Sequence, residues 1–166
     1  MGDIPRVHLV GRKNQGKTTL MVELVEELVR RGIRVGTIKH TLHSYELDTP
    51  GTDSYRHQEA GGNPAAFISG PNTAVYLTGR PGADPYEQIL DLFADCDLIL
   101  VEGDVSSSHP RVEVWREDIG EPPIAEEAEI SVLVSDDHVD FGVVVWPRSD
   151  ISVIATSLLN LAGISV

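Results

Sequence analysis

One short pattern near the start of the chain constrains the fold more than any other feature. Residues 11–18 read GRKNQGKT, which matches the phosphate-binding loop G-x-x-x-x-G-K-[ST]. The pattern follows an apolar, β-branched run at residues 6–10, typical of a strand. It precedes residues 18–31, where apolar side chains recur at helical spacing and Gly32 marks the end. This order of strand, loop and helix is the context that the motif requires, so the sequence predicts a nucleoside triphosphate site here.

The rest of the chain predicts an α/β fold. A second strand at residues 33–39 completes a strand, helix, strand unit, whose crossover favours a parallel sheet. Further elements are expected as a hairpin (65–69 and 73–78), strands (97–101, 111–115, 130–134) and helices (54–60, 85–94, 151–161). We expect the P-loop nucleoside triphosphate hydrolase fold, a mostly parallel sheet flanked by helices, in a single GTP-binding domain over residues 1–166.

Each part of the loop has a physical role in holding phosphate. Successive backbone N–H groups converge on phosphate oxygens, and the helix N-terminus adds partial positive charge. Lys17 is expected to bridge the β- and γ-phosphates, and Thr19 to donate to the α-phosphate. Thr18 offers its hydroxyl to Mg²⁺. The loop residues expected to bind the nucleotide are Gly11, Asn14, Gln15, Gly16, Lys17, Thr18 and Thr19.

Three carboxylates outside the loop are candidates for the same site. Glu102 directly follows the buried strand at 97–101 and is expected to hold Mg²⁺ together with Thr18 and to serve catalysis. Asp48, in the sequence DTPG, resembles the D-x-x-G switch of GTPases and is the second catalytic candidate. Asp136 follows a later buried strand and is placed to accept from guanine N1 and N2, donors that adenine lacks. For each of the three, an ordinary turn or strand-end carboxylate is the structural alternative.

The charge balance limits the partners. A formal net charge of −13 argues against nucleic acid, which is bound through clustered Lys and Arg. The only lysines, Lys13, Lys17 and Lys39, fall at the ends of the first two expected strands, so positive charge gathers where phosphate is expected. A surface this acidic and poor in lysine fits either an ordinary acidic protein or one adapted to high salt.

Other bulk features exclude further classes. With Cys96 as the single cysteine, neither an internal disulfide nor a cysteine-based metal cage can be built from one chain. No run approaches about eighteen consecutive apolar residues, so we expect a cytoplasmic protein without membrane association. His40 and His43 lie three residues apart, with His57 further on, but no cysteine or dense carboxylate cluster accompanies them. Substrate contact or loop structure is therefore favoured over metal ligation.

Four sequence segments together carry a resemblance to a known family. In chain order they read VGRKNQGKTTL, GTIKHTLHSYELDTPGTDSYRHQEAGG, DLILVEG and HPRVEVWR, and they span about residues 7–116. They resemble MobB, the adaptor proteins of molybdopterin-guanine dinucleotide biosynthesis. The resemblance implies a P-loop protein that binds GTP with Mg²⁺, hydrolyses it slowly at most and forms homodimers. It also implies a partner, the guanylyltransferase that joins GMP to molybdopterin in the molybdenum cofactor.

The resemblance also assigns residues. It places Gly16, Lys17, Thr18 and Thr19 on phosphate, Glu102 on Mg²⁺, and Lys39, His40, Asp53, Ser54 and Arg56 on the surface that faces the ligand. The chain departs from the family pattern at Thr52, where a lysine is usual, and at Asp104 and Val105, where an aromatic residue and a lysine usually follow VEG. Two basic groups are thus absent, and Arg56 or Arg111 would have to replace them.

Two other functions are compatible with such a loop. A small-molecule P-loop kinase generally needs a lid that carries arginines, but the segment with Arg111 and Arg116 is predicted to be a strand. A GTPase metallochaperone would need cysteines or a dense histidine cluster, which one cysteine and scattered histidines do not supply. Both remain alternatives to the adaptor.

Overall fold

The computed structural model describes residues 4–125, 127–140 and 142–165. The chain divides into two compact units. The first is made of Met1–Thr41 and Phe93–Val166, and the second of Leu42–Leu92. The single domain expected over the whole chain stays a prediction, because compactness alone does not tell whether each unit folds by itself.

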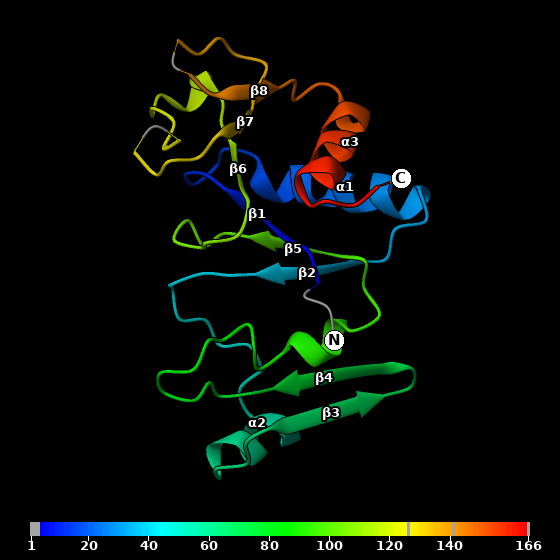
Figure 1. Cartoon of the computed structure of the whole chain (residues 1–166). Coiled ribbons are helices and arrows are strands. Elements are labelled where there is room, and N and C mark those ends of the chain that lie inside the picture. The colour runs from blue at the N-terminus through cyan, green and yellow to red at the C-terminus, as the bar shows by residue number, and fades with distance from the viewer. Residues whose placement is uncertain (1–3, 126, 141, 166) are drawn as a thin grey trace. The chain divides into compact units, whose positions relative to one another are not determined.

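A six-stranded sheet forms the centre of the first unit (Figure 1). Its spatial order is β2-β5-β1-β6-β7-β8, and every neighbouring pair is parallel. The strands are β1 (Arg6–Val10), β2 (Val35–Lys39), β5 (Leu98–Glu102), β6 (Arg111–Val114), β7 (Val132–Val134) and β8 (Val144–Trp146). The predicted mostly parallel sheet is confirmed. Because all strands run the same way, their carboxyl ends meet at one edge, where open α/β sheets bind ligands.

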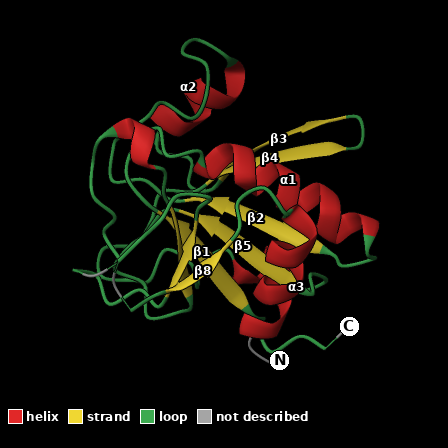
Figure 2. Ribbon diagram, turned by 90° about the horizontal axis from the view of Figure 1, so that it is seen from above, coloured by secondary structure: helices red, strands yellow, loops and turns green. Residues whose placement is uncertain are grey.

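Two helices, α1 (Lys17–Arg30) and α3 (Ile151–Leu161), cover one face of this sheet and lie side by side (Figure 2). Leu20, Leu24 and Leu28 repeat at helical spacing on α1 and are fully buried in the core against the sheet. Burying one leucine side chain stabilises a fold by about 1.5–3 kcal/mol. This apolar stripe therefore holds α1, and with it the loop that precedes the helix, against the sheet.

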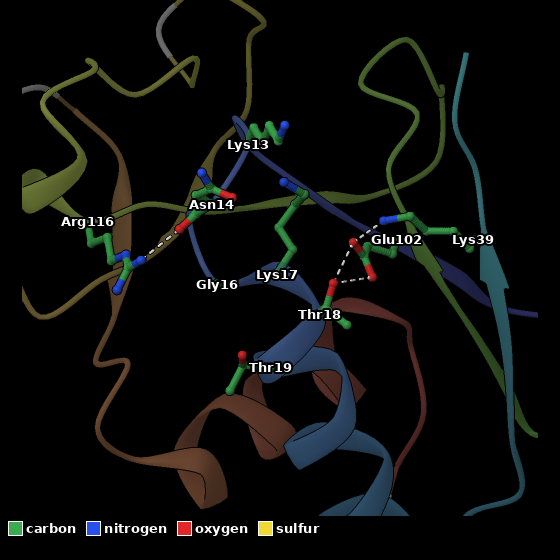
Figure 3. Close-up of a pocket in the computed structure, with 9 residues that line it drawn as sticks. All are labelled: Lys13, Asn14, Gly16, Lys17, Thr18, Thr19, Lys39, Glu102 and Arg116. Atoms are coloured by element: carbon green, nitrogen blue, oxygen red, sulfur yellow. Dashed lines mark hydrogen bonds and ion pairs between the residues drawn. The ribbon is translucent and has the colours of Figure 1, made fainter. Parts of the chain in front are cut away.

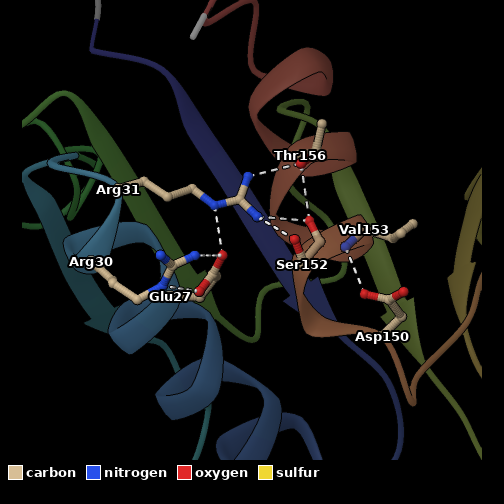
Figure 4. A network of polar contacts seen from close by, with 7 residues as sticks. All are labelled: Glu27, Arg30, Arg31, Asp150, Ser152, Val153 and Thr156. Atoms are coloured by element: carbon tan, nitrogen blue, oxygen red, sulfur yellow. Dashed lines mark hydrogen bonds and ion pairs between the residues drawn. The ribbon is translucent and has the colours of Figure 1, made fainter.

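A polar network joins the two helices at the C-terminal end of α1 (Figure 4). The Arg31 guanidinium donates to Thr156 Oγ1 at 2.8 Å and to Ser152 O at 2.9 Å. Glu27 Oε1 accepts from Arg31 Nε at 2.7 Å, and Glu27 Oε2 accepts from Arg30 Nε at 2.8 Å. Hydrogen bonds from Arg30 and Arg31 lower the pKa of Glu27 to about 2. The network complements the apolar packing by fixing how the two helices are turned against each other.

A smaller core lies on the opposite face of the sheet and is closed by the segment after β6. Val10 of β1 and Leu133 of β7 point to this face because side chains alternate along a strand. They pack with Trp115, which directly follows β6, and with Ala125 and Ile130 from the closing segment. The segment is thus part of the folded unit, not a free surface loop.

A buried carboxylate fastens the same segment to β6. Glu113 has no exposed surface, and its Oε1 and Oε2 accept from the backbone N–H groups of Ile124 and Ala125 at 2.9 and 2.7 Å. Burial raises the pKa of Glu113, while the two hydrogen bonds oppose this rise. The carboxylate therefore satisfies two backbone donors at an electrostatic cost.

The second unit contains one helix and one hairpin. Helix α2 (Asp53–Glu59) begins after Thr52, whose hydroxyl accepts from Tyr55 N at 3.3 Å. Strands β3 (Ala65–Ser69) and β4 (Asn72–Tyr76) pair antiparallel across a tight turn. The predicted short helix and hairpin are both confirmed.

One local prediction is wrong, and one strand was missed. Residues 85–94 form turns and a 3₁₀ helix, η1 (Leu90–Phe93), in place of the expected helix. Leu92 is 72% exposed, so this apolar position of the expected helix is not buried, and packing of an apolar face supplies most helix stability. Strand β8 was not predicted, although residues 143–146 read VVVW, because it is only three residues long.

A second 3₁₀ helix is η2 (Glu117–Ile119). Among the described residues, no helix combines the length and apolar character needed to cross a bilayer.

Candidate functional site

The loop between β1 and α1 adopts a backbone that its residue types allow. Gly11, Asn14 and Gly16 have φ of 134°, 65° and 92°, values that glycine and asparagine tolerate best. A Cβ at Gly11 would lie 2.5 Å from Val114 O, so only glycine fits there. Gly16 is the N-cap of α1, and the helix starts at Lys17 with first-turn N–H groups that have no intrahelical partner. The loop thus ends on a positively polarised helix terminus.

The loop borders a cavity of about 570 Å³ (Figure 3). All three lysines of the chain line this cavity, together with one arginine and one carboxylate. The cavity is therefore locally positive, although the whole chain carries −13. The lining residues are Lys13, Asn14, Gly16, Lys17, Thr18, Thr19, Lys39, Glu102 and Arg116.

Glu102 joins three elements at this cavity. The Thr18 hydroxyl, in the first turn of α1, donates to Glu102 Oε1 at 2.9 Å and faces Oε2 at 3.0 Å. Lys39 Nζ, at the end of β2, forms an ion pair with Glu102 Oε1 (Figure 3). Glu102 is 6% exposed, so this carboxylate is largely withdrawn from solvent. Thr18 and Glu102, the two residues expected to hold Mg²⁺, are thus in direct contact with each other, and their role toward the metal stays a prediction.

Lys17 folds back over the loop. Its Nζ donates to Arg12 O at 2.6 Å. Burial lowers the pKa of Lys17 below its ordinary range; Glu102 opposes this effect and Lys39 adds to it. An anionic oxygen in the cavity would favour the charged ammonium, so the site is electrostatically suited to bind one.

Arg116, directly after β6, braces the loop from the side. Its Nη2 donates to Asn14 O at 2.8 Å (Figure 3). Its backbone N–H donates to Gln15 Oε1 at 2.7 Å. Gln15 is 2% exposed, so its side chain supports the loop conformation. Arg116 was not among the predicted site residues. Its place directly after the strand expected at residues 111–115 was the available signal, but the pairing of that strand with β1 is visible only in the structure.

A second cavity, of about 550 Å³, shares Gly16, Thr19 and Arg116 with the first. Asp136 lines this second cavity, and its side chain is exposed. Its Oδ1 accepts hydrogen bonds from Ser149 N at 3.0 Å and from Ser149 Oγ at 2.9 Å. These bonds hold the carboxylate in place. The other lining residues are Gln15, Val114, Trp115, Asp118, Asp137 and Arg148.

Four predicted site residues, Asp48, Asp53, Ser54 and Arg56, belong to the second unit. Asp48 accepts from Thr49 N at 2.7 Å and from Gln58 Nε2 at 3.0 Å, bonds that fix the turn before α2. Asp48 thus has the hydrogen bonds of an ordinary turn carboxylate, which was the structural alternative to a switch residue. Asp48, Asp53 and Ser54 line a cavity of about 510 Å³ with Gly51, Thr52, Phe67 and Tyr76. Arg56 Nη1 lies 4.0 Å from Asp53 Oδ1.

His40 directly follows Lys39, the last residue of β2. Its backbone N–H donates to Glu102 O at 2.9 Å, and its Nδ1 lies 3.7 Å from Asp104 Oδ2. The aspartate that departs from the family pattern thus contacts the histidine. Among the described residues, no group of three His, Cys, Asp or Glu side chains is placed to hold a metal ion. The donor set that fits Mg²⁺ is the carboxylate of Glu102 with the hydroxyl of Thr18, both hard oxygen ligands.

Comparison with known proteins identifies the family. Residues 6–136 match the family model MobB, molybdopterin guanine dinucleotide synthesis protein B. The molybdopterin-guanine dinucleotide biosynthesis adapter protein of Haemophilus influenzae is 33% identical over 135 residues, which cover 80% of this chain and 75% of that protein. The Escherichia coli adapter protein is 31% identical over 158 residues, 92% of this chain and 90% of that protein.

The fold agrees with this match. The crystal structure of Bacillus subtilis MobB superposes with a TM-score of 0.70 at 25% identity, covering 95% of this chain and 97% of that one. This chain therefore shares its fold with a solved relative. From the family match over most of its length and the identity to two adapter proteins, this chain belongs to the MobB family.

Proposed function

We propose that this protein is a GTP-binding adapter in the synthesis of molybdopterin guanine dinucleotide. Membership of the MobB family supports the adapter role and its place beside the cofactor-biosynthesis enzymes. The observation that carries nucleotide binding is the positive cavity around the phosphate loop, where Thr18 contacts Glu102 and three lysines converge.

The triphosphate binds along the loop and the start of α1. Lys17 leaves Arg12 O for the β- and γ-phosphates, because a charged acceptor makes a stronger bond than a neutral carbonyl. Thr19 donates to the α-phosphate from the next position of the first helical turn. The Thr18 hydroxyl and the Glu102 carboxylate would hold Mg²⁺, since both offer hard oxygen ligands. When bound, Mg²⁺ neutralises part of the phosphate charge.

The base occupies the second cavity, which adjoins the first at Gly16 and Thr19. Asp136 accepts from N1 and N2 of guanine, and the two bonds from Ser149 keep its carboxylate oriented for this. Adenine presents an acceptor at N1 and no donor at C2, so it loses both contacts. This chemistry supports GTP over ATP.

Hydrolysis is expected to be slow. Among the described residues that line the phosphate cavity, Glu102 is the only carboxylate, and Thr18 and Lys39 already engage it. A group committed to metal binding is a poor general base for water. Family membership supports a partner enzyme in the same synthesis, and we expect a molybdenum cofactor guanylyltransferase to carry out guanylyl transfer with the adapter acting as a homodimer.

Fluorescent GTP and ATP analogues titrated with and without Mg²⁺ test the proposal. In Lys17→Ala, triphosphate affinity should fall by about 10- to 150-fold, since a hydrogen bond to a charged group contributes about 1.5–3 kcal/mol. Arg30→Ala is the matched control, because it removes one cation from the far end of the same helix, where the Arg30 side chain is 71% exposed. If Lys17→Ala binds GTP as tightly as the wild type, the phosphate site is elsewhere.

A further inference from the structure

The sheet register places Lys39 opposite Glu102. The two residues are Cα partners in the parallel pair β2 and β5, so their proximity is set by the backbone and not by chance rotamers. Lys39 Nζ makes its ion pair with Oε1, the same oxygen to which Thr18 Oγ1 donates at 2.9 Å. The two groups suited to hold Mg²⁺ are thus engaged with each other, and the carboxylate is engaged with an ammonium as well.

The exposure of the two side chains shows which one can move. The Glu102 side chain is 8% exposed, whereas that of Lys39 is 59% exposed. Lysine carries its charge on a flexible four-carbon stem, so the ammonium can swing without disturbing the sheet. Lys39 also lines the phosphate cavity and contributes to the repulsion felt by Lys17. A partner for it within the cavity, such as a γ-phosphate, would relieve this crowding of cations.

We propose that Lys39 is an internal counter-cation that occupies the metal position on Glu102 in the nucleotide-free protein and moves to the triphosphate when metal and nucleotide enter together. The inference rests on the proposed nucleotide site and assigns its regulation. The consequence is that metal binding and triphosphate binding are coupled. Metal alone must displace the Lys39 ammonium from Glu102 without offering it a new anion, whereas the metal–triphosphate complex supplies the ammonium with a phosphate oxygen. Each ligand therefore raises the affinity for the other by the same factor.

Mn²⁺ binding to the nucleotide-free protein tests this directly. Free Mn²⁺, measured by electron paramagnetic resonance, gives the affinity of the wild type, Lys39→Met and Lys13→Met. Lys39→Met keeps the apolar stem and removes the competing charge, so its Mn²⁺ affinity should rise about tenfold or more, the scale of one charge-assisted contact. Lys13 lines the same cavity and forms no ion pair with Glu102 in the described structure, so Lys13→Met controls for general electrostatics. It should change the affinity by less than about threefold.

A double variant locates the effect. Glu102→Gln added to Lys39→Met should abolish the gain in Mn²⁺ affinity, because the gained site is the released carboxylate. Binding by other acidic residues is common to all variants and cancels in the comparison. Matching thermal midpoints of the variants confirm that each is folded.

The outcomes separate this inference from the nucleotide proposal. Three results would each overturn the role of Lys39. Wild type and Lys39→Met could bind Mn²⁺ equally well, or Lys13→Met could gain as much Mn²⁺ affinity as Lys39→Met. The third is a gain in Mn²⁺ affinity that survives when Glu102→Gln is added to Lys39→Met. A wild type that binds no GTP analogue removes the nucleotide proposal, whatever the Mn²⁺ data show. A tenfold gain confined to Lys39→Met supports the counter-cation.

Discussion

His8 makes the stability of the first unit depend on pH. It lies in β1, at the centre of the sheet, and has no exposed surface. Its Nδ1 lies 3.2 Å from Gly103 O, an acceptor, so Nδ1 carries the proton and Nε2 accepts from Ser107 Oγ at 3.0 Å. The ring stacks on that of His109, with centroids 6.1 Å apart. Burial lowers the pKa of His8 to about 4, so the fold holds the neutral ring.

The magnitude follows from this pKa. In the unfolded chain His8 titrates near 6.5, and in the folded chain near 4. As pH falls below 6.5, the unfolded state takes up the proton and the folded state does not, so acid lowers the free energy of unfolding. At 1.36 kcal/mol per pH unit, the loss is about 1.4 kcal/mol by about pH 5.5 and about 3 kcal/mol by about pH 4.

The test is urea unfolding measured from about pH 7.5 to about pH 5.5. This pH range stays above the isoelectric point of about 4.7. The fluorescence of Trp115 and Trp146 is a suitable probe, because both are buried in the first unit, which contains His8. His8→Asn is the control: its amide still donates to Gly103 O and does not titrate. The wild type should lose about 1.4 kcal/mol more than the variant over this range. Parallel pH profiles, or a ring titration near 6.5 by NMR, would refute the reasoning.

Three further predictions concern other features. Glu113→Gln should lower the free energy of unfolding by about 1–3 kcal/mol in urea, because one buried N–H loses its acceptor. Burial raises the pKa of Glu113, so the free energy of unfolding of the wild type falls as pH rises through that pKa. The difference in this free energy between wild type and Glu113→Gln should therefore shrink with rising pH. A difference that grows with pH would contradict a raised pKa. Asp136→Asn should reduce the ratio of GTP to ATP affinity about tenfold in titrations, and an unchanged ratio rejects Asp136 as the base reader. The thermal midpoint should rise steeply in KCl from about 0.1 to about 2 M, because salt screens the repulsion behind a net charge of −13. A flat profile rejects adaptation to salt.

The elements closest to the phosphate loop were predictable from sequence because several signals agree there. Strand β1 and helix α3 have the bounds that their apolar patterns predict, and α1 starts within one residue of its expected position. The motif specifies which loop side chains line the cavity, since its strand and helix leave few ways to arrange them. Glu102 was found because it ends a buried strand that pairs with β1.

The rest depends on contacts that a linear pattern does not contain. Arg116 reaches Asn14 O only because β6 pairs with β1, a choice among several strand orders. The Lys39 and Glu102 pair needs the exact register of β2 on β5. Asp48 fits a switch motif by sequence, yet its hydrogen bonds to Thr49 and Gln58 belong to a local turn. Short polar motifs are satisfied by turns as readily as by ligands.

The strand order has a consequence for how the protein is made. Although β1 and β2 are joined by α1, they are not neighbours in the sheet, because β5 lies between them and Arg6 pairs with Ile99. A growing chain therefore carries its phosphate loop long before β5, the strand between β1 and β2, has been synthesised, whereas the β3–β4 hairpin needs only local pairing. Nascent chains that end before β5 contain two unpaired strands, β1 and β2, and unpaired strands are aggregation-prone. Translation of residues 98–102 is thus the earliest step at which Glu102 can meet Thr18 beside the phosphate loop.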